Sequence, residues 1–306
     1  MSGKQAILIA GPTASGKSGL ALELAERFGG TVVNADSMQV YDGLRILTAR
    51  PDAGDLARAP HRLYGHVDPR DAYSAGAYTR DCEVLLTELR GAAILPIFCG
   101  GTGLYFKALL GLLDTMPAVP DSLRQAWRRR LAEEGPAALH SLLVERDPAA
   151  AARIAPADGQ RIVRALEIAD VAGRPLSELQ AGQGRPLIDG GRCVKIVLTP
   201  DRAVLRERIA QRFDSMVESG AMEEVRDFRR RFGAVGGTAG KAIGLAELGA
   251  VIDGQASLEA ASERAIARTR QYAKRQETWF RHQFGPDWLR IPLRNVTEIA
   301  ALEVFR

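Results

Sequence analysis

The chain has 306 residues, of which 46% are hydrophobic and 25% charged, and its formal net charge is +4. This composition is ordinary for a soluble globular protein of one or two domains, and the slight basicity permits an anionic partner without demanding one. The three cysteines (Cys82, Cys99 and Cys193) lie far apart in the sequence, which argues against a structural zinc site and a disulfide framework.

The first third of the chain alternates between strand and helix patterns. Residues 5–10 (QAILIA) are short, apolar and branched, which predicts a buried parallel strand. A helix is expected over 18–28, a second strand over 31–34, a helix over 78–90 and a third buried strand over 92–101. This order predicts an α/β fold with a parallel sheet.

The character of the sequence changes at the two prolines of DTMPAVPDS, residues 114–122. Helical patterns follow over 123–135, 137–147 and 160–173, before a Gly-rich return over 182–192, a strand over 193–200 and further helices that include a long one over 258–284. We therefore expect an α/β core with C-terminal helices, residues 1–115 and 192–306, and a helical insertion domain, residues 116–191.

The stretch GPTASGKS, residues 11–18, fits the pattern G-x-x-x-x-G-K-[ST] between a strand and a helix. Loops of this kind surround phosphate oxygens with backbone N–H groups, and the helix N-terminus adds partial positive charge. Lys17 could reach a terminal phosphate, and the Ser18 hydroxyl could ligate Mg²⁺. The alternative is a Gly-rich turn that binds nothing. We call residues 11–18 the phosphate loop.

The ends of the predicted strands carry the other candidate groups. Nucleoside-triphosphate hydrolases usually place an aspartate for Mg²⁺ at the end of an apolar strand. Here residues 97–106 read IFCGGTGLYF without an acid, and the available strand-end carboxylate is Asp36. The phosphate loop, Asp36–Gln39 and Gly100–Thr102 should meet at the carboxyl edge of the sheet. The alternative for Asp36 is an Asx-turn or a helix cap.

Four stretches in this order, GPTASGKS, NADSMQVY, GGTGLYFKALL and TRQYAKRQETWF, resemble the bacterial tRNA dimethylallyltransferase family, also called tRNA isopentenyltransferases. PHRLYGHVDP, YSAGAYTRDC, DGQRIVRALEI and RIAQRFDSMVESG extend the resemblance from about Ala6 to Phe284. It implies a P-loop NTPase-like core. It also implies transfer of a dimethylallyl group from dimethylallyl diphosphate to the N6 amine of adenosine 37, beside the anticodon of tRNAs reading codons that begin with U.

The resemblance implies roles for four catalytic residues. Asp36 would be the general base, and Thr102 would hydrogen-bond the substrate near the reacting centre, unless it is a simple turn hydroxyl. Lys17, Arg212 and Mg²⁺ at Ser18 would stabilise the diphosphate leaving group, although on local sequence Arg212 also fits a surface helix. The diphosphate site would then comprise Gly11, Pro12, Thr13, Ala14, Ser15, Gly16, Lys17, Ser18 and Arg212.

The tRNA partner is implied in the same way, through its anticodon stem-loop. The target base must be extruded from its stacked loop. The implied tRNA contacts are Asp36, Ser37, Met38, Gln39, Thr102, Arg124, Gln160, Arg161, Ile162, Val163, Arg164, Lys274 and Arg275. Residues 264–290 carry seven Lys and Arg against two acids. These cations could contact RNA, or they could form the solvated side of an amphipathic helix whose aromatic residues face the core.

Three alternatives remain open from the sequence. A small-molecule P-loop kinase would turn over ATP and would not need the basic C-terminal helix. A non-enzymatic RNA-binding protein would bind RNA without forming product, and a transferase acting on free adenine nucleotides would not need the helical insertion. The short apolar N-terminal run fits neither a signal peptide nor a membrane span, and no strong coiled-coil pattern is present. We therefore expect a monomer in the cytoplasm.

Overall fold

In the computed structural model of the protein, residues 4–114, 116–180 and 184–292 are described. The chain forms two compact units: a core unit, from its start to Leu110 and again from Leu187, and a helical unit, Gly111–Pro186. The helical unit begins and ends five residues before the segment 116–191 marked by the sequence. Residues 1–3, 115 and 293–306 of the expected core, and residues 182–183 of the expected Gly-rich return, lie outside the described ranges.

The return into the core unit is fixed by main-chain hydrogen bonds. The amides of Leu187 and Ile188 both donate to the carbonyl oxygen of Leu109, and the Ile188 side chain is buried in the core. These contacts explain why residues 187–191 belong with the sheet rather than with the helical unit.

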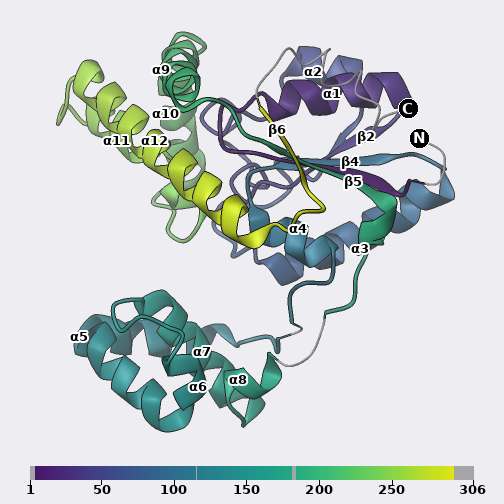
Figure 1. The fold of residues 1–306 in the computed structure, drawn as a ribbon. Helices are drawn as coiled ribbons and strands as arrows, with labels where there is room; N and C mark the ends of the chain where they lie inside the picture. The colour runs from purple at the N-terminus through teal and green to yellow at the C-terminus, as the bar shows by residue number, and fades with distance from the viewer. Residues whose placement is uncertain (1–3, 115, 181–183, 293–306) are drawn as a thin grey trace. The chain divides into compact units, whose positions relative to one another are not determined.

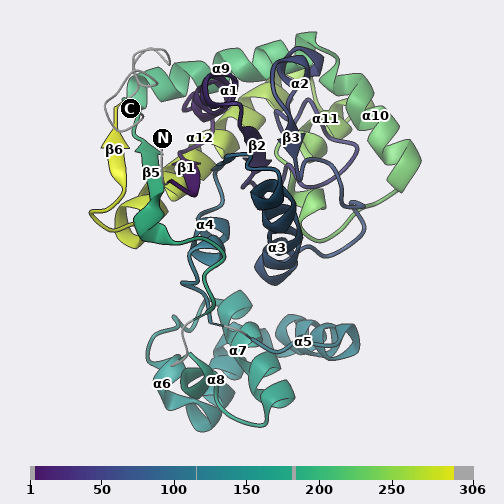
Figure 2. The same cartoon turned by 90° about the vertical axis from the view of Figure 1, so that its right-hand side faces the viewer.

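The core unit is built on a six-stranded sheet with the order β3-β2-β4-β1-β5-β6, in which every pairing is parallel. Figure 2 shows β6 and β3 at its two edges. The strands are β1 (Ala6–Ala10), β2 (Thr31–Asn34), β3 (His61–Arg62), β4 (Pro96–Gly100), β5 (Cys193–Leu198) and β6 (Leu289–Ile291). The predicted parallel sheet is confirmed. The two edge strands were missed because two or three residues are too few to show a periodic pattern.

Helices cover both faces of this sheet (Figure 1). On one face, Leu8 of β1 packs in a cluster with α3 (Ala75–Gly91) and α4 (Gly103–Leu109). On the other face, Ile7 and Ile9 of the same strand pack in a cluster with α1 (Lys17–Phe28). Because both faces are buried, the central strands are continuously apolar. The short α2 (Ala53–Arg58) precedes β3.

The C-terminal helices of the core unit are α9 (Arg202–Glu218), α10 (Ala221–Phe232), α11 (Leu245–Ile252) and α12 (Leu258–Gln283), with short 3-10 turns at Gly190–Arg192 and Ala239–Lys241. The predicted long helix is therefore confirmed as α12. Ser257 caps its N-terminus, where the side chain accepts a hydrogen bond from the Ala260 amide. Along its length, α12 contacts α11, α9 and α4 (Figure 1), so one helix spans the rim of the unit.

The helical unit consists of α5 (Asp121–Arg146), α6 (Pro148–Ala151), α7 (Gly159–Ala172) and α8 (Leu176–Leu179). Gly135 has a left-handed φ of 78° before Pro136, so α5 is two helices joined at a kink, as the sequence predicts. The unit has a core of its own, which includes Leu139, Leu143 and Ile162. In either unit, no helix within the described ranges is long and apolar enough to cross a membrane.

Candidate active site

The phosphate loop leaves the buried strand β1 and feeds directly into α1. Gly16 has a φ of 84°, which favours glycine, and Ala14 also has a positive φ of 62°. A Cβ on Gly11 would lie 2.7 Å from the Ser15 hydroxyl oxygen, so the loop is too tight there for a side chain. The Ser15 side chain is fully buried, and its hydroxyl has no partner among the described residues.

Two cations and one carboxylate surround this loop. The Lys17 ammonium donates to the Pro12 carbonyl at 3.2 Å. Burial lowers the pKa of Lys17, and the nearby Cys99 and Asp36 oppose that shift. Burial likewise lowers the pKa of Arg212, again opposed by Asp36. The site therefore concentrates positive charge where little water screens it, which favours an anionic ligand.

Arg212 reaches the loop from α9. Its guanidinium donates to the Thr13 hydroxyl, across 199 residues of sequence. The alternative of a solvated surface arginine is therefore wrong, because the side chain turns inward and is partly buried. A planar guanidinium held at the phosphate loop can present its remaining N–H groups to phosphate oxygens.

Asp36 follows the end of β2, and its two carboxylate oxygens are in different surroundings. Oδ1 accepts a hydrogen bond from the Met38 amide at 2.9 Å, which is an Asx-turn. The Asp36 amide in turn donates to Asn34 Oδ1 at 2.8 Å. Oδ2 accepts no hydrogen bond from the residues that the structure describes. The turn anticipated as an alternative is present, and it leaves one oxygen available for chemistry.

Thr102 ties the end of β4 to the segment after β2. Its hydroxyl oxygen accepts from the Ser37 amide at 2.9 Å and lies 3.2 Å from the Ser37 hydroxyl. Its own amide donates to the Ala35 carbonyl at 3.1 Å. A Cβ on Gly100 would lie 2.0 Å from that same carbonyl, so only glycine permits the approach. Thr102 is therefore more than an isolated turn hydroxyl.

Gln276 of α12 is a site residue that the sequence reasoning missed. Its side chain is 5% exposed, it accepts from the Thr13 amide at 2.9 Å, and it donates to the Gly101 carbonyl at 3.0 Å. It lies on the same helix face as the buried Ala273 and Phe280. A glutamine on an apolar helix face was the available signal, because a buried amide must find partners.

The segment Asp36–Gln39, which the resemblance implies to contact tRNA, makes several hydrogen bonds within the protein. The Gln39 side chain donates to the carbonyl oxygens of Thr48 and Ala49, at 2.8 and 2.9 Å. Its backbone carbonyl accepts from the Gly65 amide at 2.9 Å. Gln39 therefore fixes the loop after Asp36, and its side-chain amide is not directed to a ligand.

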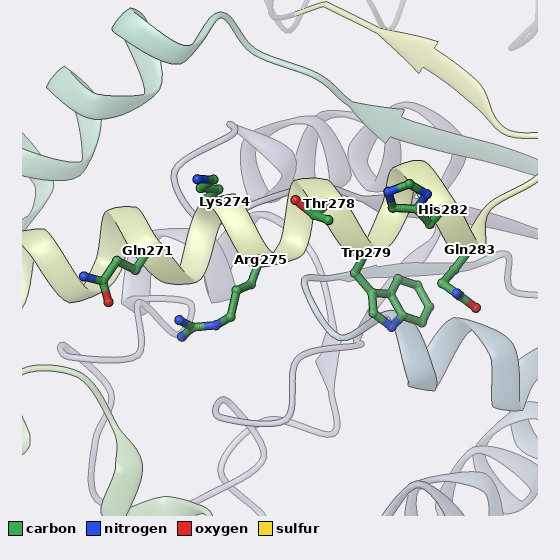
Figure 3. A pocket seen from close by; sticks show the side chains of 7 residues that line it. All are labelled: Gln271, Lys274, Arg275, Thr278, Trp279, His282 and Gln283. Carbon is green, nitrogen blue, oxygen red and sulfur yellow. The ribbon is translucent and has the colours of Figure 1, made fainter. Parts of the chain in front are cut away.

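The outer side of α12 carries a pocket of about 540 Å³. Figure 3 shows its lining side chains: Gln271, Lys274, Arg275, Thr278, Trp279, His282 and Gln283. Lys107 of α4 donates to Gln283 at 2.6 Å and lies 5.8 Å from the centre of the Trp279 ring. Lys274 and Arg275 are exposed here, in agreement with the expectation that the cations of this helix face solvent.

In the helical unit, the predicted RNA-contacting segment divides into two faces of α7. Gln160, Arg161 and Arg164 are exposed. Ile162 and Val163 are buried in the core of the unit, so the expectation that they contact tRNA is wrong for their side chains. The helical period places these two residues on the apolar face. Arg124 of α5 is partly exposed and lies 3.3 Å from Asp121.

The donor groups for a metal ion are sparse. Among the described residues, no cluster of three or more His, Cys, Asp or Glu side chains could hold a metal. Ser18 lies exposed at the start of α1 beside Cys99. An exposed hydroxyl without an accompanying carboxylate cage fits Mg²⁺ that keeps waters and takes most of its other ligands from substrate phosphates.

Comparisons with known proteins agree with this geometry. The chain matches the family described as IPP transferase over residues 39–283, and the family described as isopentenyl transferase over residues 4–71. It is 55% identical to the tRNA dimethylallyltransferase of Chelativorans sp. strain BNC1 over 95% of this chain and 99% of that protein. It is 53% identical to that of Agrobacterium fabrum, over 94% and 96%.

Solved structures give the same result. The tRNA isopentenylpyrophosphate transferase of Bacillus halodurans superposes with a TM-score of 0.67 at 33% identity, covering 97% of this chain and 94% of that one. A eukaryotic dimethylallyltransferase acting on tRNA superposes with a TM-score of 0.82 at 28% identity, covering 98% and 77%. With its phosphate loop, strand-end aspartate and parallel sheet, the chain belongs to the IPP transferase family, the family of the tRNA dimethylallyltransferases.

Proposed function

We propose that this protein transfers a dimethylallyl group from dimethylallyl diphosphate to the N6 amine of adenosine 37 in tRNAs that read codons beginning with U. One observation carries the proposal. A carboxylate with one available oxygen, Asp36, lies beside two partly buried cations, Lys17 and Arg212, at the phosphate loop. A base and an anion site in one place suit an alkyl transfer that removes a proton and releases diphosphate.

The reaction needs both halves of this arrangement. The exocyclic amine of adenine is a weak nucleophile, because its lone pair is delocalised into the ring. A carboxylate that takes its proton as the new C–N bond forms lowers the barrier, and we assign this role to Asp36 Oδ2. As the allylic C–O bond breaks, negative charge grows on the diphosphate, where Lys17, Arg212 and the loop amides stabilise it. Mg²⁺ held at Ser18 would neutralise part of the same charge.

A residue near the end of β4 argues against phosphoryl transfer. Where a nucleoside-triphosphate hydrolase usually carries an aspartate for Mg²⁺, this chain has Cys99, which lies beside Ser18 and Lys17. Burial raises the pKa of the Cys99 thiol to about 11, so this side chain is neutral at physiological pH. A neutral thiol is a poor ligand for Mg²⁺, which prefers oxygen.

The tRNA would be held by exposed cations on both units. Lys274 and Arg275 lie on the outer side of α12, the helix whose inner side contributes Gln276 to the site. Arg161 and Arg164 lie on the exposed face of α7. Such groups contact phosphates, while the target base is extruded from its stacked loop towards Asp36. A free nucleotide would need neither set of cations.

The test is a transfer assay. Purified protein is mixed with Mg²⁺, radiolabelled dimethylallyl diphosphate and unmodified tRNA that reads codons beginning with U. Asp36→Asn is run beside the wild type, because asparagine keeps the oxygen for the Asx-turn and removes the base. We expect label in the tRNA with wild type and roughly 10²–10⁴-fold less with Asp36→Asn, while tRNA binding changes little.

Asp227→Asn is the matched control, since it removes an exposed carboxylate on α10 that pairs with Arg230. It should retain wild-type transfer. Label absent from the tRNA, together with ATP consumption in the presence of a small acceptor, would show a kinase. Binding of tRNA without any product, unchanged in Asp36→Asn, would show an RNA-binding protein.

A further inference from the structure

Gln276 is the one polar residue among the buried side chains of α12. Its two hydrogen bonds go to loops that are far apart in the chain. Thr13 lies 263 residues away in the phosphate loop, and Gly101 lies 175 residues away after β4. Both partners are backbone groups, so the contacts depend on the shape of these loops and not on their side chains.

The two partners together need a side chain that both accepts and donates a hydrogen bond, as the Gln276 amide does. The Thr13 N–H is a donor and needs an acceptor, whereas the Gly101 carbonyl is an acceptor and needs a donor. A carboxylate could serve only the first and an ammonium only the second, while an aliphatic side chain could serve neither. Since the side chain is 5% exposed, water could not easily replace a lost partner.

The loops that Gln276 joins lie at the groups proposed for the two parts of the reaction, which are release of diphosphate and removal of the proton. Thr13 belongs to the phosphate loop and also receives Arg212. Gly101 lies between Gly100, which packs against Ala35, and Thr102, which is bonded to Ser37. A Cβ added to Gly101 would lie 2.1 Å from Gln276 Nε2 and 3.1 Å from Asp36 Oδ2. The amide is therefore next to the carboxylate as well as between the loops.

We propose that Gln276 is a positioning residue that holds the diphosphate site and the segments that carry Asp36 and Thr102 at the separation that transfer needs. This inference rests on the proposed function. In an alkyl transfer, the leaving oxygen, the allylic carbon and the attacking nitrogen must lie in line, and a shift of about 1 Å can cost 10²-fold in rate. An amide clamped to both loops limits such shifts without itself touching the reacting atoms.

Two variants disrupt the contact between Gln276 and Gly101, one at each residue. Gln276→Met keeps the size of the side chain and removes both hydrogen bonds. Gly101→Ala leaves Gln276 in place but puts a methyl group where its Nε2 lies, and Gly101 does not have a positive φ that would disfavour alanine. The controls are Gln255→Met, an exposed glutamine, and Gly91→Ala, where an added Cβ meets nothing within 4 Å.

Steady-state transfer to tRNA gives kcat, the KM for dimethylallyl diphosphate and the KM for tRNA, and thermal unfolding is measured on each variant. We expect kcat to fall by about 10- to 100-fold in both variants, with each KM within about threefold of wild type, because the contact orients bound substrates and does not bind them. The two controls should match wild type.

Three outcomes would overturn the inference. A folded Gln276→Met with wild-type kcat would leave the amide a structural group of the core. A KM for dimethylallyl diphosphate raised tenfold at unchanged kcat would make it a binding group. An inactive wild type would remove the proposed function and this inference with it. If Gln276→Met does not fold, a folded Gly101→Ala with wild-type kcat overturns the inference in the same way.

Discussion

The core unit and the helical unit hold their functional side chains in opposite ways. In the core unit, the candidate site is assembled by contacts between distant segments: Arg212 to Thr13 and Gln276 to Gly101. In the helical unit, the two exposed arginines expected to contact tRNA pair with neighbours on α7 or its cap. Arg161 lies 3.4 Å from Asp158, and Arg164 lies 3.4 Å from Glu167.

This difference divides the side chains that take part in the reaction from those that bind tRNA. Groups that stabilise a transition state must be in place before the reaction, and burial among fixed neighbours achieves this. Groups that bind an RNA backbone need only exchange a weak surface ion pair for a phosphate, and such pairs contribute about 0–1 kcal/mol. We therefore expect substitutions in the core unit to lower kcat, and substitutions on α7 to weaken tRNA binding.

Among the cations, the largest effect should come from Arg212. Arg212→Met removes the cation and its bond to Thr13 while keeping much of the apolar stem. Loss of one preorganised group that stabilises developing charge typically costs about 10²–10³ in kcat. Arg212→Lys keeps the charge but loses the planar guanidinium, so its kcat should lie between those of Arg212→Met and the wild type. Single-turnover transfer at saturating tRNA and dimethylallyl diphosphate measures this.

Arg208→Met is the control for that series, because Arg208 is an exposed arginine one turn earlier on α9. It should transfer at the wild-type rate. If Arg212→Met instead raises only the KM for tRNA and keeps kcat, Arg212 belongs with the groups that bind tRNA. The assignment of catalytic groups to the core unit and tRNA-binding groups to the helical unit would then be wrong for Arg212.

Local patterns predicted the parts of the site that depend on short segments. The phosphate loop is recognisable because its glycines and Lys17 occupy fixed positions between a strand and a helix. Asp36 is recognisable because parallel strands end at one edge of a sheet. The four central strands and α12 were also predictable, since runs of buried residues and long helical periods are strong signals.

What local patterns could not predict depends on packing between distant segments. Local sequence presents Arg212 as one of several arginines on α9, and only the fold shows that it turns inward to Thr13. Gln276 stands in a run of charged residues, KRQE, where a polar side chain looks solvated. Ile162 and Val163 show the opposite error, because assigning a whole segment to RNA ignored which face of the helix is buried.

A smaller effect is expected on the helical unit. Arg161→Gln with Arg164→Gln removes two cations from α7 while keeping polar side chains. We expect the Kd for tRNA to rise about 5- to 10-fold at low salt, and the slope of log K against log[salt] to become shallower by about 1 for each cation that contacts a phosphate. At saturating tRNA, kcat should stay within about twofold of wild type.

Arg230→Gln removes one cation from an exposed site of α10 and should leave the Kd unchanged. Thermal unfolding must accompany the measurement, because Glu167 is buried and loses its partner when Arg164 is replaced. A lower kcat at saturating tRNA in a stable double variant would contradict the claim that these arginines bind tRNA without taking part in the reaction.

The smallest expected effect is on the pH dependence of stability, and it comes from the buried Cys99 thiol beside Lys17 and Ser18 of the phosphate loop. All three cysteines lie in the core unit, and burial raises the pKa of Cys99 from 9.0 to about 11. The folded state therefore keeps this proton at pH values where the unfolded state has lost it. The resulting stability is fully present below pH 9 and is lost as the pH rises through 11.

Cys99→Ala isolates this contribution. Between pH 7 and pH 10, the free energy of unfolding of the wild type should fall by about 1 kcal/mol more than that of the variant, since each pKa unit corresponds to 1.36 kcal/mol. Urea titrations at the two pH values measure the difference, in which the constant cost of the smaller side chain cancels. Equal pH dependence would mean that the thiol is open to water. Water beside the phosphate loop would then weaken the attraction of Lys17 and Arg212 to a diphosphate.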